Sequence, residues 1–166
     1  MAAHLIIIGG HEPLAWVLDN QRMAFSAGSR SQGAAAPAKG DEILLYTTRD
    51  CFRRPTRNRG RIMGLATVTS ETAPLADKVV FGGRRFTTGC TLRVHGLAPR
   101  GEGVVLADLV TQLEVFPDPR HWSLRMRRAS LQLPDTDADF LRRELQPTLR
   151  PYRSVLGEYA FSPALT

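Results

Sequence analysis

The apolar residues of this chain fall into short runs separated by Gly, Pro and Ser. Runs of this length, either continuous or alternating with polar residues, predict β-strands. We expect strands at residues 4–8, 23–26, 42–47, 61–70, 86–96 and 131–133. Gly9 and Gly10 end the first strand, and Gly64 inside the fourth indicates a β-bulge or a close approach of two backbones. Residues 74–83 show no regular pattern and are expected to be irregular.

Three segments show the apolar spacing of short amphipathic helices. The first, residues 12–20, carries a proline in its first turn, where proline is tolerated. The second covers residues 106–115, and the third, residues 135–147, opens with acidic capping residues. Residues 121–126 are expected to be extended or turn-like. Five or six strands with a few short helices and no βαβ alternation predict an α+β fold, a mixed, mostly antiparallel β-barrel with short flanking helices.

The length of 166 residues fits one domain with one sizeable core. We expect this domain to span residues 1–147, with residues 148–166 forming a C-terminal tail that packs on it. The Gly, Ser, Ala and Pro content of residues 27–39 predicts a mobile loop. The longest apolar run, residues 5–8, is far shorter than the roughly 20 residues of a membrane helix, and we find no secretion signal. We therefore expect a cytoplasmic protein, and we favour a monomer.

Arginine dominates the positive charge of the chain. The formal net charge is +6, the isoelectric point is about 10.1, and Lys39 and Lys78 are the only lysines among 22 basic residues. Guanidinium groups bind phosphate oxygens through two hydrogen bonds and stack on bases, so the excess fits a nucleic-acid partner, DNA or RNA. A GC-rich genome would explain arginine in place of lysine, but it would not explain the excess of positive charge.

Motifs that carry catalysis or bind metals are missing from the sequence. There is no phosphate-binding glycine loop, and residues 28–33 do not complete a G-x-S-x-G serine motif. The four histidines lack metal-ligand spacing, and Cys51 and Cys90 form no CxxC pair. We therefore predict no cofactor, no metal and no catalytic residue. Two alternatives stay open: a small enzyme that acts on a nucleoside or an amide, and a protein-interaction module.

Several blocks of the sequence occur in a recognisable order. Residues 5–18 contain an apolar strand and a Trp-bearing helix, and residues 23–26 read Met-Ala-Phe-Ser. Residues 39–46, KGDEILLY, form a turn and a strand, and residues 61–71, RIMGLATVTSE, form the next strand. Residues 109–133 contain His-Trp-Ser and lead into a helix. In order and spacing these blocks resemble the EVE-domain family, which is similar in fold to PUA, YTH and ASCH domains.

This resemblance implies a PUA-like barrel that holds a nucleobase, modified or not, without catalysing a reaction. Aromatic faces would return about 1–3 kcal/mol per stacked base, and arginines would hold the phosphates. The candidate base-binding residues are Gly9, Gly10, His11, Phe25, Ser26, Tyr46, Phe86 and Trp122. The candidate phosphate contacts are Arg125, Arg127 and Arg128. Core packing is the alternative role of Phe25 and Trp122, Phe81 is an alternative to Phe86, and Trp16 is expected in the core.

Overall fold

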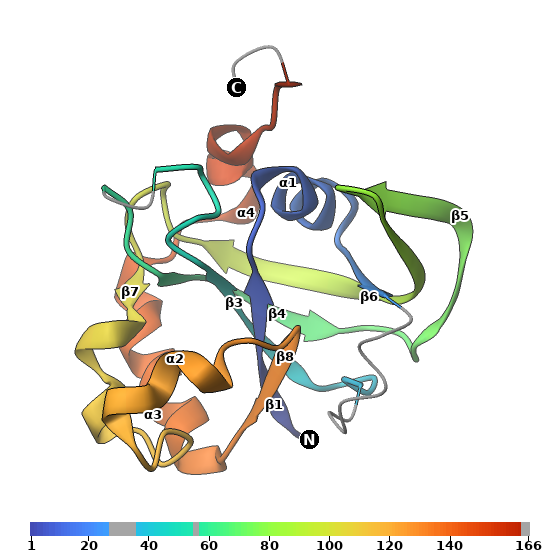
Figure 1. Ribbon diagram of the computed structural model, residues 1–166. Helices are drawn as coiled ribbons and strands as arrows, with labels where there is room; N and C mark the ends of the chain where they lie inside the picture. The colour runs from blue at the N-terminus through green and yellow to red at the C-terminus, as the bar shows by residue number, and fades with distance from the viewer. Residues whose placement is uncertain (27–35, 55–56, 164–166) are drawn as a thin grey trace.

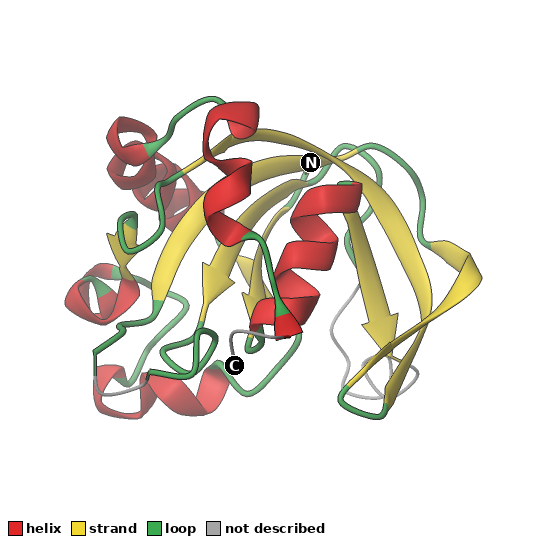
Figure 2. Cartoon of the chain, turned by 90° about the horizontal axis from the view of Figure 1, so that it is seen from above, coloured by secondary structure: helices red, strands yellow, loops and turns green. Residues whose placement is uncertain are grey.

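A computed structural model describes residues 1–26, 36–54 and 57–163 of the chain. Within these residues one sheet of eight strands runs in the order β2-β6-β4-β3-β1-β8, with β5 beside β6 and β7 beside β4. All pairings are antiparallel except that of β1 with β3. The strands are β1 (Ala3–Ile8), β2 (Arg22–Ser26), β3 (Glu42–Thr47), β4 (Arg61–Val68), β5 (Ala73–Phe81), β6 (Arg84–Leu97), β7 (Val104–Val105) and β8 (Ser130–Leu133). The sheet curls into a half-barrel (Figures 1 and 2), which confirms the predicted α+β, mostly antiparallel fold of PUA-like type.

Short helices flank this sheet. They are α1 (His11–Asn20), α2 (Trp122–Arg125), α3 (Asp135–Leu145) and α4 (Tyr152–Val155), with 3-10 turns at Leu106–Asp108, Val110–Gln112, Pro119–His121, Gln146–Thr148 and Leu156–Tyr159. Helix α1 lies between α4 on one side and the β5–β6 hairpin on the other (Figure 1). Among the described residues, no helix has the length and apolar character needed to span a membrane.

The sheet separates two apolar cores. On β3, Ile43 and Leu45 enter the first core whereas Leu44 enters the second, because successive side chains of a strand point to opposite faces. Leu14 of α1 belongs to the first core, and Leu141 of α3 belongs to the second. Fully burying one such side chain contributes about 1.5–3 kcal/mol. Burial on both faces explains why the sequence of β3 reads as a continuous apolar run.

The C-terminal segment packs against the first core. Val155 and Tyr159 are buried there, and the Tyr159 hydroxyl donates a hydrogen bond to the carbonyl of Ala98. The Tyr152 hydroxyl donates a hydrogen bond to the carbonyl of Leu18 in α1. Two tyrosines therefore attach this segment to α1 and to the end of β6.

A buried hydrogen bond between a histidine and an aspartate joins the start of β1 to β3. Nε2 of His4 lies 2.9 Å from Oδ2 of Asp41. The amides of Ala2 and Ala38 donate to the same carboxylate at 3.0 and 2.9 Å. Burial raises the pKa of Asp41, but the Ala38 amide, His4 and the Ala2 amide together lower it below its ordinary value. The folded chain therefore favours the ionised carboxylate.

The expectation that residues 74–83 are irregular is wrong, because these residues form most of β5 and the tight turn that follows it. Gly82 and Gly83 have φ values of 54° and 79° and connect β5 to β6 as a two-residue hairpin turn. Most residues of β5 are exposed. A strand with little buried surface shows no clear alternation of apolar and polar residues, which explains the error.

The prediction of a helix at residues 106–115 is also wrong, because two short 3-10 turns occupy this segment. The carboxylate of Asp137 accepts the amides of Glu114 and Val115 at 3.0 and 2.8 Å. The chain is already extended at Leu113, just before these two amides. The hydrogen bonds to Asp137 therefore hold this part of the chain in a non-helical path. The apolar residues still face the second core, which is why their spacing looked helical.

Residues 121–126, expected to be extended or turn-like, contain the whole of the short helix α2. Asp118 caps the preceding 3-10 turn, since its side chain accepts the amide of Arg120 at 3.2 Å, and Pro119 occupies the first position of that turn. The start signal for this helical segment is therefore polar, and apolar spacing alone does not reveal it.

The prediction for Gly64 is confirmed. A Cβ atom at this position would lie 3.0 Å from Cδ1 of Leu45 and 3.0 Å from Cδ2 of Leu97. The register between β3 and β4 shifts beside it, between Leu45 and Tyr46. Gly64 therefore permits a close approach of three strands next to a bulge.

Candidate functional site

A cavity of about 990 Å³ opens where the C-terminal end of β1 meets α1. Its wall is completed by β2, the turn between β5 and β6, residues 48–53, residues 126–129 and the C-terminal segment. Parts of the chain that are far apart in sequence therefore meet around α1 (Figure 1). The aromatic side chains that line the cavity are His11, Trp16, Phe25, Phe81, Phe86 and Phe161.

Most of the residues predicted to contact a base or a phosphate line this cavity. They are Gly9, Gly10, His11, Phe25, Ser26, Phe86, Arg127 and Arg128. The glycines connect β1 to α1, so their backbone forms part of the wall itself. The cavity thus brings together predicted residues that are far apart in the sequence, and their contact with a base stays a prediction.

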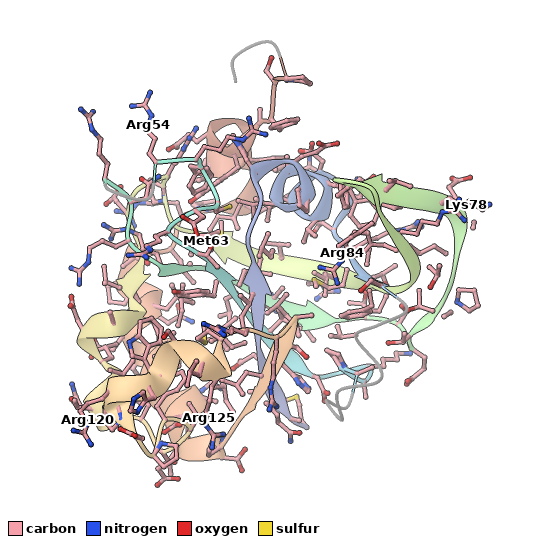
Figure 3. All side chains as sticks on the ribbon, viewed as in Figure 1. Arg54, Met63, Lys78, Arg84, Arg120 and Arg125 are labelled. Atoms are coloured by element: carbon pink, nitrogen blue, oxygen red, sulfur yellow. The ribbon has the colours of Figure 1, made fainter. Side chains whose placement is uncertain are left out.

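Tyr46, Trp122 and Arg125 do not line the cavity. The base-binding roles predicted for Tyr46 and Trp122 are corrected, and the phosphate contact of Arg125 stays a prediction. Tyr46 points from β3 into the second core, where its ring fills the space beside Gly60. The Trp122 ring packs edge-on against Phe116 at the same core, with ring centroids 5.9 Å apart. Arg125 is exposed on α2, toward the lower edge of the view in Figure 3. Core packing therefore accounts for both aromatic side chains.

Phe25 belongs chiefly to the first core, although it also lines the cavity. Only 7% of its surface is exposed. A register shift follows it on β2, where Ser26 pairs with Phe86 of β6. The Ser26 hydroxyl accepts a hydrogen bond from Nη2 of Arg84 at 3.2 Å. The bulge therefore places a hydroxyl and a guanidinium group at the wall next to Phe25.

Three aromatic side chains form one end of the cavity, beside the β5–β6 turn. The ring centroids of Trp16 and Phe81 are 6.1 Å apart at 70°, and those of Phe81 and Phe86 are 5.3 Å apart at 62°. Trp16, expected in the core, packs against the first core, but its side chain is only half-buried and also lines the cavity. Helical spacing identifies an inward face, but it does not distinguish a core from a cavity.

A second aromatic group stands at the N-terminal end of α1. The His11 ring makes edge-on contacts with Phe52 and Phe161, at centroid distances of 5.1 and 5.4 Å. Nε2 of His11 lies 3.0 Å from the carbonyl oxygen of Tyr159. Because a carbonyl only accepts, the neutral ring carries its hydrogen on Nε2 and leaves Nδ1 as an acceptor. Sequence reasoning missed Phe161, which lies in the C-terminal tail.

The charged residues on the wall favour an anionic ligand. They are four arginines and two acids, namely Arg53, Arg84, Arg127, Arg128, Glu12 and Asp50. Among the ion pairs of the described residues, none involves these arginines, whereas Arg59, which does not line the cavity, pairs with Asp108 at 2.7 Å. Guanidinium groups without an acidic partner are available to phosphate oxygens.

One thiol borders the cavity, but its chemistry is not that of a nucleophile. Cys51 lines the wall and is buried, and burial raises its pKa to about 12 although the charge of Arg100 opposes this. At neutral pH the sulfur therefore stays protonated and weakly reactive. In the part of the chain that the structure describes, no group of three or more His, Cys, Asp or Glu residues is placed to hold a metal ion.

No protein-family model and no curated protein matches the sequence. Solved structures resemble its fold. The NMR structure of Rpa0253 from Rhodopseudomonas palustris is similar with a TM-score of 0.55 and 14% identity, over 89% of this chain and 94% of that chain. The crystal structure of the YTH domain of Zygosaccharomyces rouxii MRB1 protein, in complex with N6-methyladenosine RNA, is similar with a TM-score of 0.51 and 13% identity, over 85% of each chain. At such identities the likeness shows the fold, which is YTH-like and PUA-like, while membership of the EVE family stays a prediction.

Proposed function

We propose that this chain binds a nucleobase of a single strand, or a base turned out of its stack, without catalysing a reaction on it. The observation that carries the proposal is the cavity beside α1, where half-buried aromatic rings share one wall with arginines that form no ion pair within the described residues. Removing a base from its stack costs a few kcal/mol. Stacking on an aromatic side chain returns about 1–3 kcal/mol per base, so this wall supplies energy of the required size.

The arginines suit the backbone that accompanies a base. Arg127 and Arg128 lie on the segment between α2 and β8, and Arg84 lies beside the β5–β6 turn. Phosphate contacts of this kind position a nucleic acid but do not read its sequence. Discrimination among bases would then come from the cavity, through Ser26, the acceptor nitrogen of His11 and the backbone of the glycines.

The fold supports RNA as the first polymer to test. The similar YTH domain of MRB1 was solved in complex with N6-methyladenosine RNA. We therefore propose RNA with a modified adenine as the leading candidate and DNA as the alternative. The thiol on the wall is held protonated by burial, so Cys51 does not support a nucleophilic role at this site.

Binding of a fluorescent single-stranded RNA to two variants tests the proposal. Phe86→Ala removes a half-buried ring from the wall, and we expect binding to weaken by about 5- to 150-fold, the equivalent of one stacked base. Phe140→Ala is the matched control, because Phe140 is also half-buried but packs against the second core. Equal affinities of the wild-type protein and Phe86→Ala would contradict a base pocket at this wall.

A further inference from the structure

The aromatic side chains of the cavity form two separate groups. Phe81 contacts both Trp16 and Phe86 beside the β5–β6 turn, whereas His11 and Phe161 contact each other beside the C-terminal segment. His11 and Trp16 both belong to α1 and are five residues apart, which corresponds to about 7.5 Å along the helix axis. Helix α1 lies between α4 and the β5–β6 hairpin (Figure 1).

Both groups open into the same space. At about 990 Å³ the cavity is at the upper end of the roughly 300–1,000 Å³ typical of small-molecule sites, so it exceeds the needs of one small ring. The ring contacts in the two groups have interplanar angles between 62° and 73°. These pairs are edge-on, so they leave ring faces that are not covered by a parallel ring. A ring face of this kind is what a flat base needs in order to stack.

We propose that the cavity holds two successive nucleotides, with one base at the β5–β6 turn and the second against Phe161 and His11. This inference rests on the proposed base-binding function and assigns a second subsite to it. Arg84 lines the first end, and Arg53 lies among residues 48–53 near the second, so each nucleotide has a guanidinium group for its phosphate. Two bases in separate subsites require an unpaired strand, which identifies the partner as single-stranded.

Phe161 is held in place although it lies near the end of the chain. Tyr159, two residues before it, is buried, and its hydroxyl donates to the carbonyl of Ala98. The carbonyl of Tyr159 in turn accepts a hydrogen bond from Nε2 of His11 at 3.0 Å. The segment that carries Phe161 is therefore fastened to both the core and α1. A fixed aromatic side chain stacks a base with a small loss of conformational entropy.

Isothermal titration calorimetry with short ligands tests the second subsite. The probes are N6-methyladenosine 5′-monophosphate, adenosine 5′-monophosphate, and the 5′-phosphorylated RNA dinucleotides with N6-methyladenosine in the first, the second or neither position. We expect the best dinucleotide to bind about 5- to 150-fold more tightly than its mononucleotide, as one additional stacked base predicts. Phe161→Ala should abolish this gain, so that the dinucleotide binds no more tightly than the mononucleotide. Phe161→Leu, which stays apolar but lacks a ring face, should lose the same gain.

The outcomes separate the second subsite from the base-binding proposal. If neither mononucleotides nor dinucleotides bind, the proposed function itself is overturned. If mononucleotides bind but no dinucleotide binds more tightly, the second subsite alone is overturned. The same conclusion follows if Phe161→Ala weakens both ligand classes equally. The control Phe140→Ala should match the wild-type protein with every probe.

Discussion

A methyl group added at Gly9 would meet one atom within 4 Å among the described residues, Oγ1 of Thr48 at 3.7 Å, which is an ordinary contact distance. Gly9 is not among the glycines with positive φ, so alanine can adopt its backbone conformation. Gly9→Ala should therefore fold normally. Because alanine allows the unfolded backbone fewer conformations than glycine does, the substitution should add about 0.4–1 kcal/mol of stability, which raises Tm by about 1–4 °C.

The same substitution should lower the affinity for the ligand although it raises the stability of the protein. Gly9 and Thr48 both line the cavity, so the added methyl group takes space from whatever binds there. Adding atoms to a well-packed site costs about 1–3 kcal/mol, which corresponds to a loss of about 5- to 150-fold in affinity. Gly9→Val, with a larger side chain, should lose at least as much.

Thermal melting and fluorescence polarisation with a labelled single-stranded RNA measure the two effects on the same samples. Gly157→Ala is the matched control, because it makes the same substitution at an exposed glycine with no atom within 4 Å among the described residues and no place on the cavity wall. It should bind RNA as the wild-type protein does. If Gly9→Ala is as stable as expected and also binds with wild-type affinity, the ligand does not approach the end of β1, and the proposed position of the base is refuted.

Three further predictions concern charge, pH and the thiols. Replacing Arg127 and Arg128 by glutamine should reduce the slope of log Kd against log salt by about 0.7 for each phosphate of a single strand that the protein no longer neutralises, and an unchanged slope would exclude a phosphate-binding role for both arginines. Because the folded-state pKa of Asp41 lies below its unfolded value of about 3.9, its contribution to stability is present above that value and is lost as pH falls through the folded pKa. The difference in urea unfolding free energy between wild-type protein and Asp41→Asn should therefore be largest near neutral pH and shrink below about pH 4, whereas a constant difference would contradict this assignment. Burial raises the pKa of Cys51 to about 12 and that of Cys90 to about 11, so a disulfide reagent at pH 8 should label them only as the chain unfolds, and fast labelling of the native protein would contradict their burial.

Sequence patterns predict the central strands well because those strands are buried on both faces. Ile43, Leu44 and Leu45 enter two different cores, so β3 appears in the sequence as an uninterrupted apolar run. The same logic fails for β5, whose exposed residues carry no alternation. The turn at Gly82 and Gly83 was the available signal, since two glycines between extended segments are typical of a hairpin.

The cavity was predictable only in part. Residues at the end of β1 could be placed from the resemblance, because glycines that follow a strand mark a turn. Trp16 could not, since an inward helical position is compatible with a core or with a cavity. Phe161 could not be placed either. Its position depends on the hydrogen bond between His11 and the carbonyl of Tyr159, two residues that are 148 positions apart in the sequence. Long-range contacts of this kind leave no periodic signal in the sequence.

Part of the loop predicted at residues 27–39 lies outside the residues that the structure describes. These are residues 27–35, and they include the serine-containing stretch at residues 28–33. The cavity wall, with its aromatic groups and its arginines, consists of described residues.

Fluorescence polarisation of the purified protein with short RNA and DNA probes, methylated and unmethylated, tests base binding most directly. Each probe is titrated in single- and double-stranded form at a low and a high salt concentration. We predict tighter binding of one single-stranded probe, and a preference for its base or modification that persists at high salt, because stacking is screened far less than phosphate contacts. Binding that ignores base and modification and disappears at high salt would show only a basic surface and would contradict the base pocket.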